Sequence, residues 1–256
     1  METLLLERDQ HIALITINRP QRLNAISNTL IEELTALMRS LDAGGALRAA
    51  ILTGAGERAF CVGMDLKERA GMSDDELALQ RPRMFEMFAA VRKYPLPLIA
   101  AVNGHALGGG LEFALCCDFI YASTAATFGM PEVSRGIMPG GGASQLLPRL
   151  VGTARASEMI YTGASIGAEE AGRIGLVNRV LAPAELLPAA KATAQLIAAN
   201  APVGVRQSKR AIHFGASVEA GIGFENEAYR AVLTSADRRE GYVAFNEKRV
   251  PVFKGE

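Results

Sequence analysis

Residues 98–142 read LIAAVNGHALGGGLEFALCCDFIYASTAATFGMPEVSRGIMPGGG. The stretch begins with a short apolar run, residues 98–102, whose length and composition predict a buried strand. Three glycines, residues 108–110, follow, and residues 111–117 predict the first turns of a buried helix. Glycine allows a sharp backbone turn and a close approach of a ligand to peptide N–H groups. A glycine turn that opens a helix therefore directs unpaired N–H groups at an anion, or at an oxygen that becomes anionic during a reaction.

Two carboxylates flank this glycine turn. Glu112 lies in the first turn of the predicted helix, and Glu132 follows Pro131 in a second turn. A further glycine cluster, residues 140–142, comes soon after. Either acid alone has an ordinary structural explanation, because the helix dipole favours Glu in a first turn and a Glu after Pro is commonly solvated. Two acids beside a site for a developing oxyanion predict general acid/base chemistry.

Composition limits the classes of protein to which the chain can belong. It has 256 residues, of which 49% are hydrophobic and 21% charged, so it can bury the core of an ordinary globular protein. The 27 basic and 27 acidic residues balance, which argues against nucleic acid as a partner. No signal-peptide pattern or membrane span is expected. Three cysteines match neither a disulfide framework nor a zinc spacing, so we expect a cytoplasmic protein without a metal.

The first part of the chain alternates strand and helix patterns. Two apolar runs at the start predict a hairpin. Ser27 and Ser73 are predicted to cap two helices, and Glu76 completes a capping box with Ser73. The expected strands are residues 3–8, 11–17, 48–53 and 98–102, and the expected helices are residues 27–42 and 73–94.

Helical patterns dominate after residue 142. One strand-like run, residues 176–181, interrupts them. The expected helices are residues 144–150, 154–161, 168–173, 184–199, 203–214, 218–234 and 238–247. We therefore predict an α/β core over residues 1–195 and a helical C-terminal region over residues 196–256. The apolar positions within residues 218–234 need a surface to cover, which is either another subunit or the chain's own core.

A short motif at residues 163–167 is typical of serine hydrolases, but the residues that precede it argue against that function. Residues 163–167 match the Gly-x-Ser-x-Gly pattern of a serine-hydrolase elbow, which requires a preceding strand. Residues 158–161 instead resemble the end of a helix, so Gly163 is better explained as a helix stop and Ser165 as part of the next helix start. The phosphate-binding motifs of nucleotide folds are absent from the sequence.

The motifs of this chain resemble those of the enoyl-CoA hydratase/isomerase (crotonase) family. Six groups of residues occur in the family's order and spacing and together cover essentially the whole chain. They are residues 18–25, 60–67, 101–112, 128–132, 139–142 and 237–249. Two segments, residues 65–73 and 247–256, look particularly like those of methylglutaconyl-CoA hydratases.

The resemblance implies a fold, an assembly and a ligand. Family members hold an acyl-CoA thioester in a spiral of ββα units followed by a helical C-terminal region. We therefore expect a crotonase-type α/β fold in which residues 196–256 take part in oligomer contacts. Homotrimers, or hexamers that are dimers of trimers, are usual in the family. Neither a cofactor beyond the CoA of the substrate nor a metal ion is expected.

The resemblance also assigns roles to individual residues. By this resemblance, the N–H groups of Met64 and Gly109 polarise the thioester carbonyl, and Glu112 and Glu132 are the catalytic acids. Water would lie between the two acids, with the N–H of Gly140 as a further contact. Contacts with the acyl-CoA are expected from a larger set, namely Arg22, Leu23, Ala25, Asp65, Leu66, Lys67, Gly140 and Lys248.

The pair of acids decides which reaction the resemblance favours. Hydratases resemble this chain in having both carboxylates, whereas isomerases typically keep only the acid that matches Glu132. We therefore predict a 2-enoyl-CoA hydratase for short or branched acyl groups, with 3-methylglutaconyl-CoA as one candidate substrate. The alternative is a Δ3,Δ2-enoyl-CoA isomerase. An RNA-binding or catalytically idle homologue is a further alternative, against which the intact acids and the balanced charge count.

Overall fold

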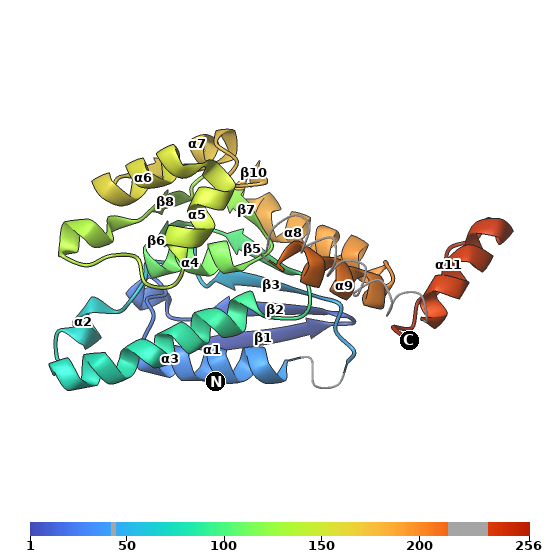
Figure 1. Cartoon of the computed structure of the whole chain (residues 1–256), viewed down its shortest axis with the longest axis horizontal. Coiled ribbons are helices and arrows are strands. Elements are labelled where there is room, and N and C mark those ends of the chain that lie inside the picture. Colours follow the sequence, from blue (N-terminus) through green and yellow to red (C-terminus); the bar gives the residue numbers. More distant parts are fainter. Residues whose placement is uncertain (42–44, 215–234) are drawn as a thin grey trace.

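The larger of two sheets forms the centre of the molecule (Figure 1). The computed structural model describes residues 1–41, 45–214 and 235–256. The strand order of this sheet is β1-β2-β3-β5-β7-β10, with β1 antiparallel to β2 and the other pairs parallel. The strands are β1 (Leu4–Asp9), β2 (Ile12–Ile17), β3 (Ala49–Gly54), β5 (Leu98–Val102), β7 (Phe119–Ser123) and β10 (Arg179–Leu181).

A second, smaller sheet consists of three-residue strands in the order β4-β6-β8-β9. Its strands are β4 (Ala59–Cys61), β6 (His105–Leu107), β8 (Thr127–Gly129) and β9 (Ser165–Gly167). β4, β6 and β8 are parallel, and β9 is antiparallel to β8. Each of three successive chain segments contributes one strand to the larger sheet and the next to the smaller one, in the pairs β3 and β4, β5 and β6, and β7 and β8. This repetition is the ββα spiral that the motifs imply.

Helices follow these strand pairs and fill the C-terminal part. The α-helices are α1 (Asn28–Ser40), α2 (Leu66–Arg69), α3 (Asp74–Arg92), α4 (Gly109–Cys116), α5 (Ala143–Val151), α6 (Thr153–Thr162), α7 (Ala168–Arg173), α8 (Pro183–Ala198), α9 (Pro202–Ile212) and α11 (Ala236–Glu247). Two 3₁₀ helices are η1 (Pro20–Arg22) and η2 (Pro131–Arg135). Within the described residues, none of the helices has the length and apolar character needed to span a membrane.

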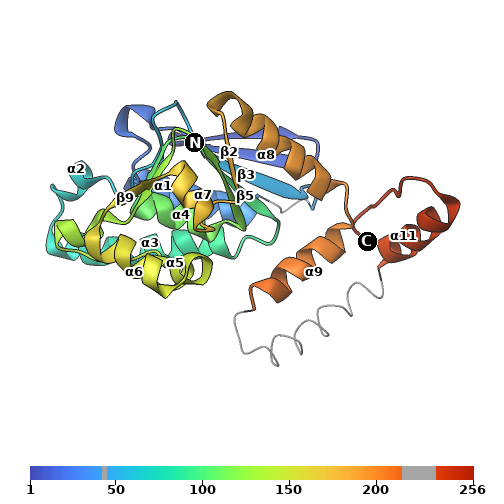
Figure 2. The same ribbon diagram turned by 90° about the horizontal axis from the view of Figure 1, so that it is seen from above.

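The two faces of the larger sheet are both covered. Successive side chains of a strand point to opposite faces, and β3 follows this rule. Ala50 and Leu52 belong to the main core, which also contains apolar side chains of α1, α3 and α4. Ala49 and Ile51 face the other way and pack with Leu186 and other residues of α8. Figure 2 shows α8 along the side of the strands away from α4. The sheet is therefore buried on both faces, as a parallel sheet requires.

The C-terminal helices α9 and α11 lie to the side of this α/β body (Figure 2). Arg48 connects the parts by donating hydrogen bonds to the carbonyls of Ala198, at 2.8 Å, and Phe253, at 2.7 Å. Lys209 of α9 forms an ion pair with Asp118 at 2.8 Å. The predicted boundary between residues 195 and 196 lies within α8, and the predicted helix over residues 218–234 lies outside the described residues.

Several local predictions from the sequence are confirmed. The hydroxyl of Ser27 accepts a hydrogen bond from the N–H of Leu30 at 3.2 Å, and Ser73 and Glu76 form the capping box of α3. Gly163 directly follows the last residue of α6 and has a left-handed backbone conformation, with φ 66°. It therefore ends the helix, as the sequence predicted when the hydrolase motif was rejected.

Two local predictions are wrong. Ser165 does not begin a helix but lies in β9, which pairs with β8, and α7 begins only at Ala168. Only the last three residues of the predicted strand over residues 176–181 form β10, because only Arg179–Leu181 pair with β7. In both cases the pairing with a strand distant in sequence decides the local structure.

Candidate active site

A cavity of about 530 Å³ opens where η1, α2, α3, η2 and the start of α4 meet. All residues predicted for the site line this cavity except Lys248. Lys248 is exposed and directly follows the last residue of α11, which lies away from the α/β body (Figure 2). The other predicted residues therefore line one cavity of the described chain, and the role of Lys248 stays a prediction.

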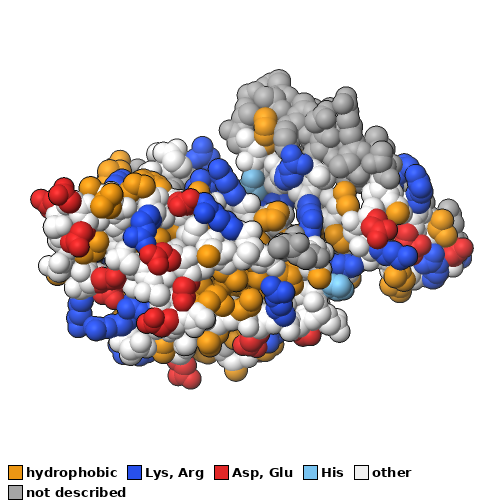
Figure 3. All heavy atoms as spheres, turned by 90° about the horizontal axis from the view of Figure 1, so that it is seen from below, with side chains coloured by type: hydrophobic (Ala, Val, Ile, Leu, Met, Phe, Trp, Pro, Cys, Tyr) orange, Lys and Arg blue, Asp and Glu red, His pale blue; other side chains and the backbone are white. Residues whose placement is uncertain are grey.

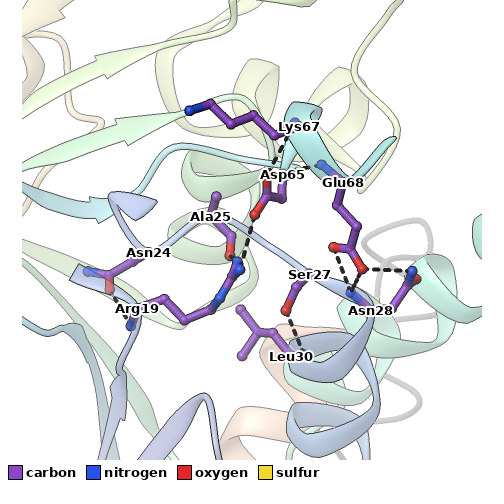
Figure 4. Close-up of polar contacts among 9 residues, drawn as sticks. All are labelled: Arg19, Asn24, Ala25, Ser27, Asn28, Leu30, Asp65, Lys67 and Glu68. Atoms are coloured by element: carbon purple, nitrogen blue, oxygen red, sulfur yellow. Dashed lines mark hydrogen bonds and ion pairs between the residues drawn. The ribbon is translucent and has the colours of Figure 1, made fainter. Parts of the chain in front are cut away.

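A buried asparagine holds the loop that forms one wall (Figure 4). Leu23 and Asn24 have left-handed backbone conformations, with φ 51° and 56°. The side chain of Asn24 donates to the carbonyls of Ala55, at 3.0 Å, and Ala59, at 2.8 Å. Its Oδ1 accepts the N–H of Arg19 at 2.9 Å. These bonds offset the strain of the turn and fix the backbone of the cavity wall.

Arg19 connects this loop to the segment before α2 (Figure 4). Its guanidinium donates to the carbonyl of Ala25 at 2.5 Å and pairs with Asp65 at 3.1 Å. Asp65 also caps α2 by accepting the N–H groups of Lys67 and Glu68. Burial would raise the pKa of Asp65, but the Arg19 bond and the α2 N–H groups lower it below its usual value. Asp65 therefore acts in the described structure as a charged structural residue at the edge of the cavity.

Met64 and Gly109, whose N–H groups are the predicted donors, both line the cavity. Ile26 forms a parallel bridge with Met64, in which Ile26 bonds the carbonyl of Gly63 at 2.8 Å and the N–H of Asp65 at 2.9 Å. This pattern directs the N–H of Met64 to the opposite side of the strand. There Gly109 begins α4, and a Cβ on Gly63 would lie only 3.1 Å from the Gly109 nitrogen. Within the described part of the chain, neither N–H donates a hydrogen bond.

Glu112 is almost fully buried beside this pair. Its Oε1 accepts the N–H of Gly141 at 2.6 Å and that of Ala143 at 3.0 Å. Burial raises the pKa of Glu112 above its usual value, while the N–H groups of residues 140–143 oppose that rise. The carboxylate is therefore held in one orientation by the second glycine cluster.

Glu132 is the second buried carboxylate of the cavity. It follows Pro131 in η2 and is 8% exposed, and its Oε1 lies 2.9 Å from the position that a Cβ on Gly108 would occupy. Its Oε2 is buried and has no hydrogen-bond partner within the described residues. Burial raises the pKa of Glu132 to about 7, to which the charge of Glu112 also contributes, while its own backbone N–H and Arg135 oppose the rise. Near neutral pH this side chain can either give or take a proton.

Three cations of the lining were not identified from the sequence. They are Arg69 of α2, Arg81 of α3 and Arg135 of η2. Arg81 precedes Met84 and Phe88 by three and seven residues, so helical spacing alone would have placed it on the face of the predicted helix 73–94 that enters the core. Arg69 carried no comparable signal, because α2 is only four residues long.

Metal-binding chemistry has no evident place in the described chain. Across residues 1–41, 45–214 and 235–256, no group of three or more His, Cys, Asp or Glu side chains is arranged to hold a metal ion. The three cysteines are buried and unpaired. Burial raises the pKa of the Cys61 thiol to about 12, so the thiol is neutral at physiological pH.

The fold and this cavity define an α/β protein with two unpaired backbone donors beside two buried carboxylates. Comparison with known proteins gives the same class. The family model described as enoyl-CoA hydratase/isomerase matches residues 7–256. The chain therefore belongs to the enoyl-CoA hydratase/isomerase family, which confirms the resemblance found in its motifs.

Individual relatives match over nearly their whole length. A putative enoyl-CoA hydratase/isomerase, YngF, from Bacillus subtilis is 45% identical over 97% of this chain and 96% of its own. A short-chain-enoyl-CoA hydratase from Clostridium acetobutylicum is 41% identical over 97% and 96%. The crystal structure of an enoyl-CoA hydratase from Bacillus anthracis, 42% identical, superposes with a TM-score of 0.97 over 99% of this chain and 100% of that one. The crotonase fold expected from the sequence is therefore confirmed.

Proposed function

We propose that the protein is an enoyl-CoA hydratase, a hydro-lyase that adds water across the double bond of short or branched 2-enoyl-CoA thioesters. One observation carries the proposal: Glu112 and Glu132 line the same cavity as the unpaired N–H groups of Met64 and Gly109. Hydration needs both a base for water and an acid for carbon, whereas moving a double bond needs only one group that carries a proton. The relatives from Clostridium acetobutylicum and Bacillus anthracis are both named as enoyl-CoA hydratases, which agrees with hydration rather than isomerisation.

The backbone donors would act on the thioester carbonyl. When hydroxide adds to Cβ, electrons move through Cα to the carbonyl oxygen, which becomes enolate-like. Two N–H groups already directed at that oxygen stabilise the charge without reorganisation, and each such donor contributes on the order of 3 kcal/mol in measured enzymes. Gly109 adds the positive end of the α4 dipole, although this helix has only eight residues.

The two acids would divide the proton transfers. Glu112, oriented by the N–H groups of Gly141 and Ala143, accepts a proton from water as the water oxygen bonds to Cβ. Glu132 then gives its proton to Cα, which restores the thioester carbonyl. The raised pKa of Glu132, about 7, keeps that proton available near neutral pH. The overall step adds one water molecule and needs no other reactant.

The CoA part is proposed to lie along the η1 loop and α2. Arg22 and Lys67 line both the main cavity and a neighbouring hollow that Ser27 and Thr29 border. Their positive charges suit the phosphates of CoA. Leu23, Ala25, Asp65 and Leu66 supply the adjoining wall. Lys248 would contribute only from outside the cavity as it stands in the described chain.

The experiment follows the loss of the conjugated thioester absorbance of crotonyl-CoA and 3-methylglutaconyl-CoA. Glu112→Gln and Glu132→Gln are expected to reduce kcat at least about a hundredfold, the usual contribution of a general acid or base. The matched control is Glu158→Gln, an exposed glutamate on α6 that pairs with Arg155. Activity that is indifferent to Glu112, together with turnover of a 3-enoyl-CoA, would replace the proposal by the isomerase. Inactivity toward every thioester would favour an idle homologue.

RNA binding finds no support in the charge distribution. The chain has as many acidic as basic residues, and Figure 3 shows side chains of both charges interspersed on one face. A nucleic-acid surface instead needs a continuous basic patch. Tight RNA binding in a gel-shift assay at physiological salt would contradict this part of the proposal.

The assembly is proposed to be a homotrimer or a hexamer made of two trimers, with residues 196–256 in the contacts. Exposed apolar side chains on this region support the proposal: Ile212 is 78% exposed, Val250 83% and Val252 67%. Such side chains are favourable in an interface and unfavourable in water. Light scattering after size exclusion gives the mass directly. Ile212→Asp is expected to lower it, and a monomeric wild type would overturn the proposal.

A further inference from the structure

Two arginines that the hydration chemistry does not use line the cavity close enough for their charges to interact. Met84 lines the cavity with Arg69 and Arg81. Nη2 of Arg69 is 3.9 Å from the Met84 sulfur. The Met84 methyl group and Nη1 of Arg81 lie 3.5 Å and 3.4 Å from the position that a Cβ on Gly140 would occupy. Both guanidinium groups therefore lie in the neighbourhood of the Met84 side chain.

Arg69 is held in place by a buried polar network. Its Nε donates to Oε1 of Gln80 at 2.9 Å, and Gln80 is only 2% exposed. Nε2 of Gln80 donates to Oδ1 of Asn28 at 2.8 Å, and Asn28 in turn donates to Glu68 at 2.9 Å. Because a buried amide is costly unless it is hydrogen-bonded, these bonds fix Gln80 and, through it, the Nε–H of Arg69. The network occupies Nε and Nη2 lies against the Met84 sulfur, so Nη1 has no partner among the described residues.

Arg81 lines the cavity from α3. Its guanidinium lies over the ring of Phe85, 4.8 Å from the ring centre, which restricts its orientation. Gly140, against which Nη1 lies, directly precedes Gly141, whose N–H bonds Glu112. Arg81 therefore lies beside the proposed reaction centre, whereas Arg22 and Lys67 line the part that continues into the neighbouring hollow.

Neither arginine forms an ion pair with a carboxylate in the described part of the chain. Of the acids in the lining, Asp65 pairs with Arg19 and Glu112 accepts backbone N–H groups, while Glu132 lies against Gly108 with its Oε2 unbonded among the described residues. Burial lowers the pKa of Arg69, and the charge of Arg81 lowers it further. Two like charges held together without an anion favour binding of one.

We propose that Arg69 and Arg81 bind a carboxylate at the far end of the acyl group. This inference rests on the proposed function, and it defines the substrates of the proposed hydratase as 2-enoyl-CoA thioesters of dicarboxylic acids. The apolar side chains of Met84 and Phe88 line the cavity with the two arginines and suit the carbons between the thioester and the carboxylate. A guanidinium binds a carboxylate through two parallel N–H···O bonds, which a methyl group cannot form. A second guanidinium strengthens the preference of the site for a terminal carboxylate over a terminal methyl group. 3-Methylglutaconyl-CoA belongs to this class of substrate.

The test measures binding of two saturated thioesters that cannot react, glutaryl-CoA and pentanoyl-CoA. Their acyl chains have the same number of carbons and differ only in the terminal carboxylate. Titration calorimetry is expected to give about tenfold or tighter binding of glutaryl-CoA by the wild type. Arg81→Met and Arg69→Met are each expected to reduce this preference about tenfold. The control, Arg83→Met, changes an exposed arginine of the same helix that pairs with Glu32 and is expected to keep the preference.

Each outcome has a defined meaning. Equal binding of the two thioesters by the wild type, or an undiminished preference in Arg81→Met, overturns the inference. Arg81 is exposed, so this variant is expected to fold even if Arg69→Met does not. A preference for glutaryl-CoA without any hydration of glutaconyl-CoA leaves the subsite supported and overturns the proposed function alone. Absence of binding by either thioester overturns both.

Discussion

The Oε1 atom of Glu112 accepts the N–H of Gly141 at 2.6 Å, and the same glycine leaves the space in which the other carboxylate oxygen lies. A Cβ at residue 141 would lie 2.7 Å from Oε2 of Glu112 and 2.6 Å from the ring of Phe88. The glycine therefore has two functions: its backbone orients the acid, and its missing side chain makes room for it.

Gly141→Ala is expected to lower kcat by about a hundredfold, because displacing a catalytic group by about 1 Å has effects of that size. The proposed hydration of crotonyl-CoA is the readout. Gly167→Ala is the matched control, since nothing lies within 4 Å of the position of its Cβ. Full activity of Gly141→Ala would mean that the position of Glu112 does not limit the reaction.

The pH dependence of hydration is expected to follow Glu132. Because its pKa is raised to about 7 and the proposed role requires its proton, kcat/KM should fall as the pH rises above about 7. The positive charge of Arg135 opposes the rise of this pKa, so Arg135→Gln is expected to move the midpoint to higher pH. Arg149→Gln, which changes an exposed arginine of α5, should leave the midpoint unchanged. A profile that is flat across neutral pH would exclude this role.

The stability of the folded chain is expected to depend on the same proton. The pKa of Glu132 is about 7 in the folded chain, against an ordinary value of 4.5 for a solvated glutamate. Between these values the unfolded chain releases the proton and the folded chain keeps it, so the free energy of unfolding falls as the pH rises. The expected fall is on the order of 2 kcal/mol, because solvent in the open cavity screens part of the effect.

Urea unfolding of wild type and Glu132→Gln at several pH values measures this contribution. The variant has no titrating proton at residue 132, so the wild type should lose stability relative to it between about pH 4.5 and pH 7. Glu112 titrates in both proteins, and because its charge helps to raise the pKa of Glu132, the difference between the two curves includes the coupling of the two acids. Parallel curves for the two proteins would show that Glu132 titrates at the same pH in the folded and unfolded chains.

Removing the side chain of Asn24 is expected to destabilise the chain more than it alters the chemistry. Asn24→Ala leaves the carbonyls of Ala55 and Ala59 and the N–H of Arg19 without their partners. The expected loss is about 2–4 kcal/mol of unfolding free energy, which a fall in the thermal midpoint reports. Asn200→Ala, at an exposed asparagine, is the control. An unchanged midpoint would mean that solvent replaces these bonds at no cost.

Much of the larger sheet and its helices could be predicted from the sequence. The apolar runs of β2 and β5, the cap of α1 and the capping box of α3 are all local signals, and the structure contains each of them. The glycine turn and Glu112 were also found locally, because Gly109 begins α4 and Glu112 lies in its first turn. Their catalytic roles remain predictions.

The smaller sheet could not be predicted in the same way. Its strands have three residues each, which is too short for an alternating pattern, and their pairing joins residues such as Ser165 and Gly129 that are far apart in sequence. Arg69 was missed for a related reason. It donates to Gln80, from another helix, and no spacing within one segment reports that contact.

The smaller sheet also sets the spacing between three residues of the site. β4, β6 and β8 are parallel neighbours that end at Cys61, Leu107 and Gly129. Met64, Gly109 and Glu132 follow these ends within two or three residues, so the separation of strands, about 4.8 Å, sets their spacing. Side chains can therefore be exchanged at residues 64 and 132 without altering the distances between the backbone groups, whereas a Cβ at residue 109 would lie 3.1 Å from Cδ1 of Ile26. Under the proposed function, the same scaffold can hold a different acid at residue 132, and so a different reaction, while the two backbone donors keep their places.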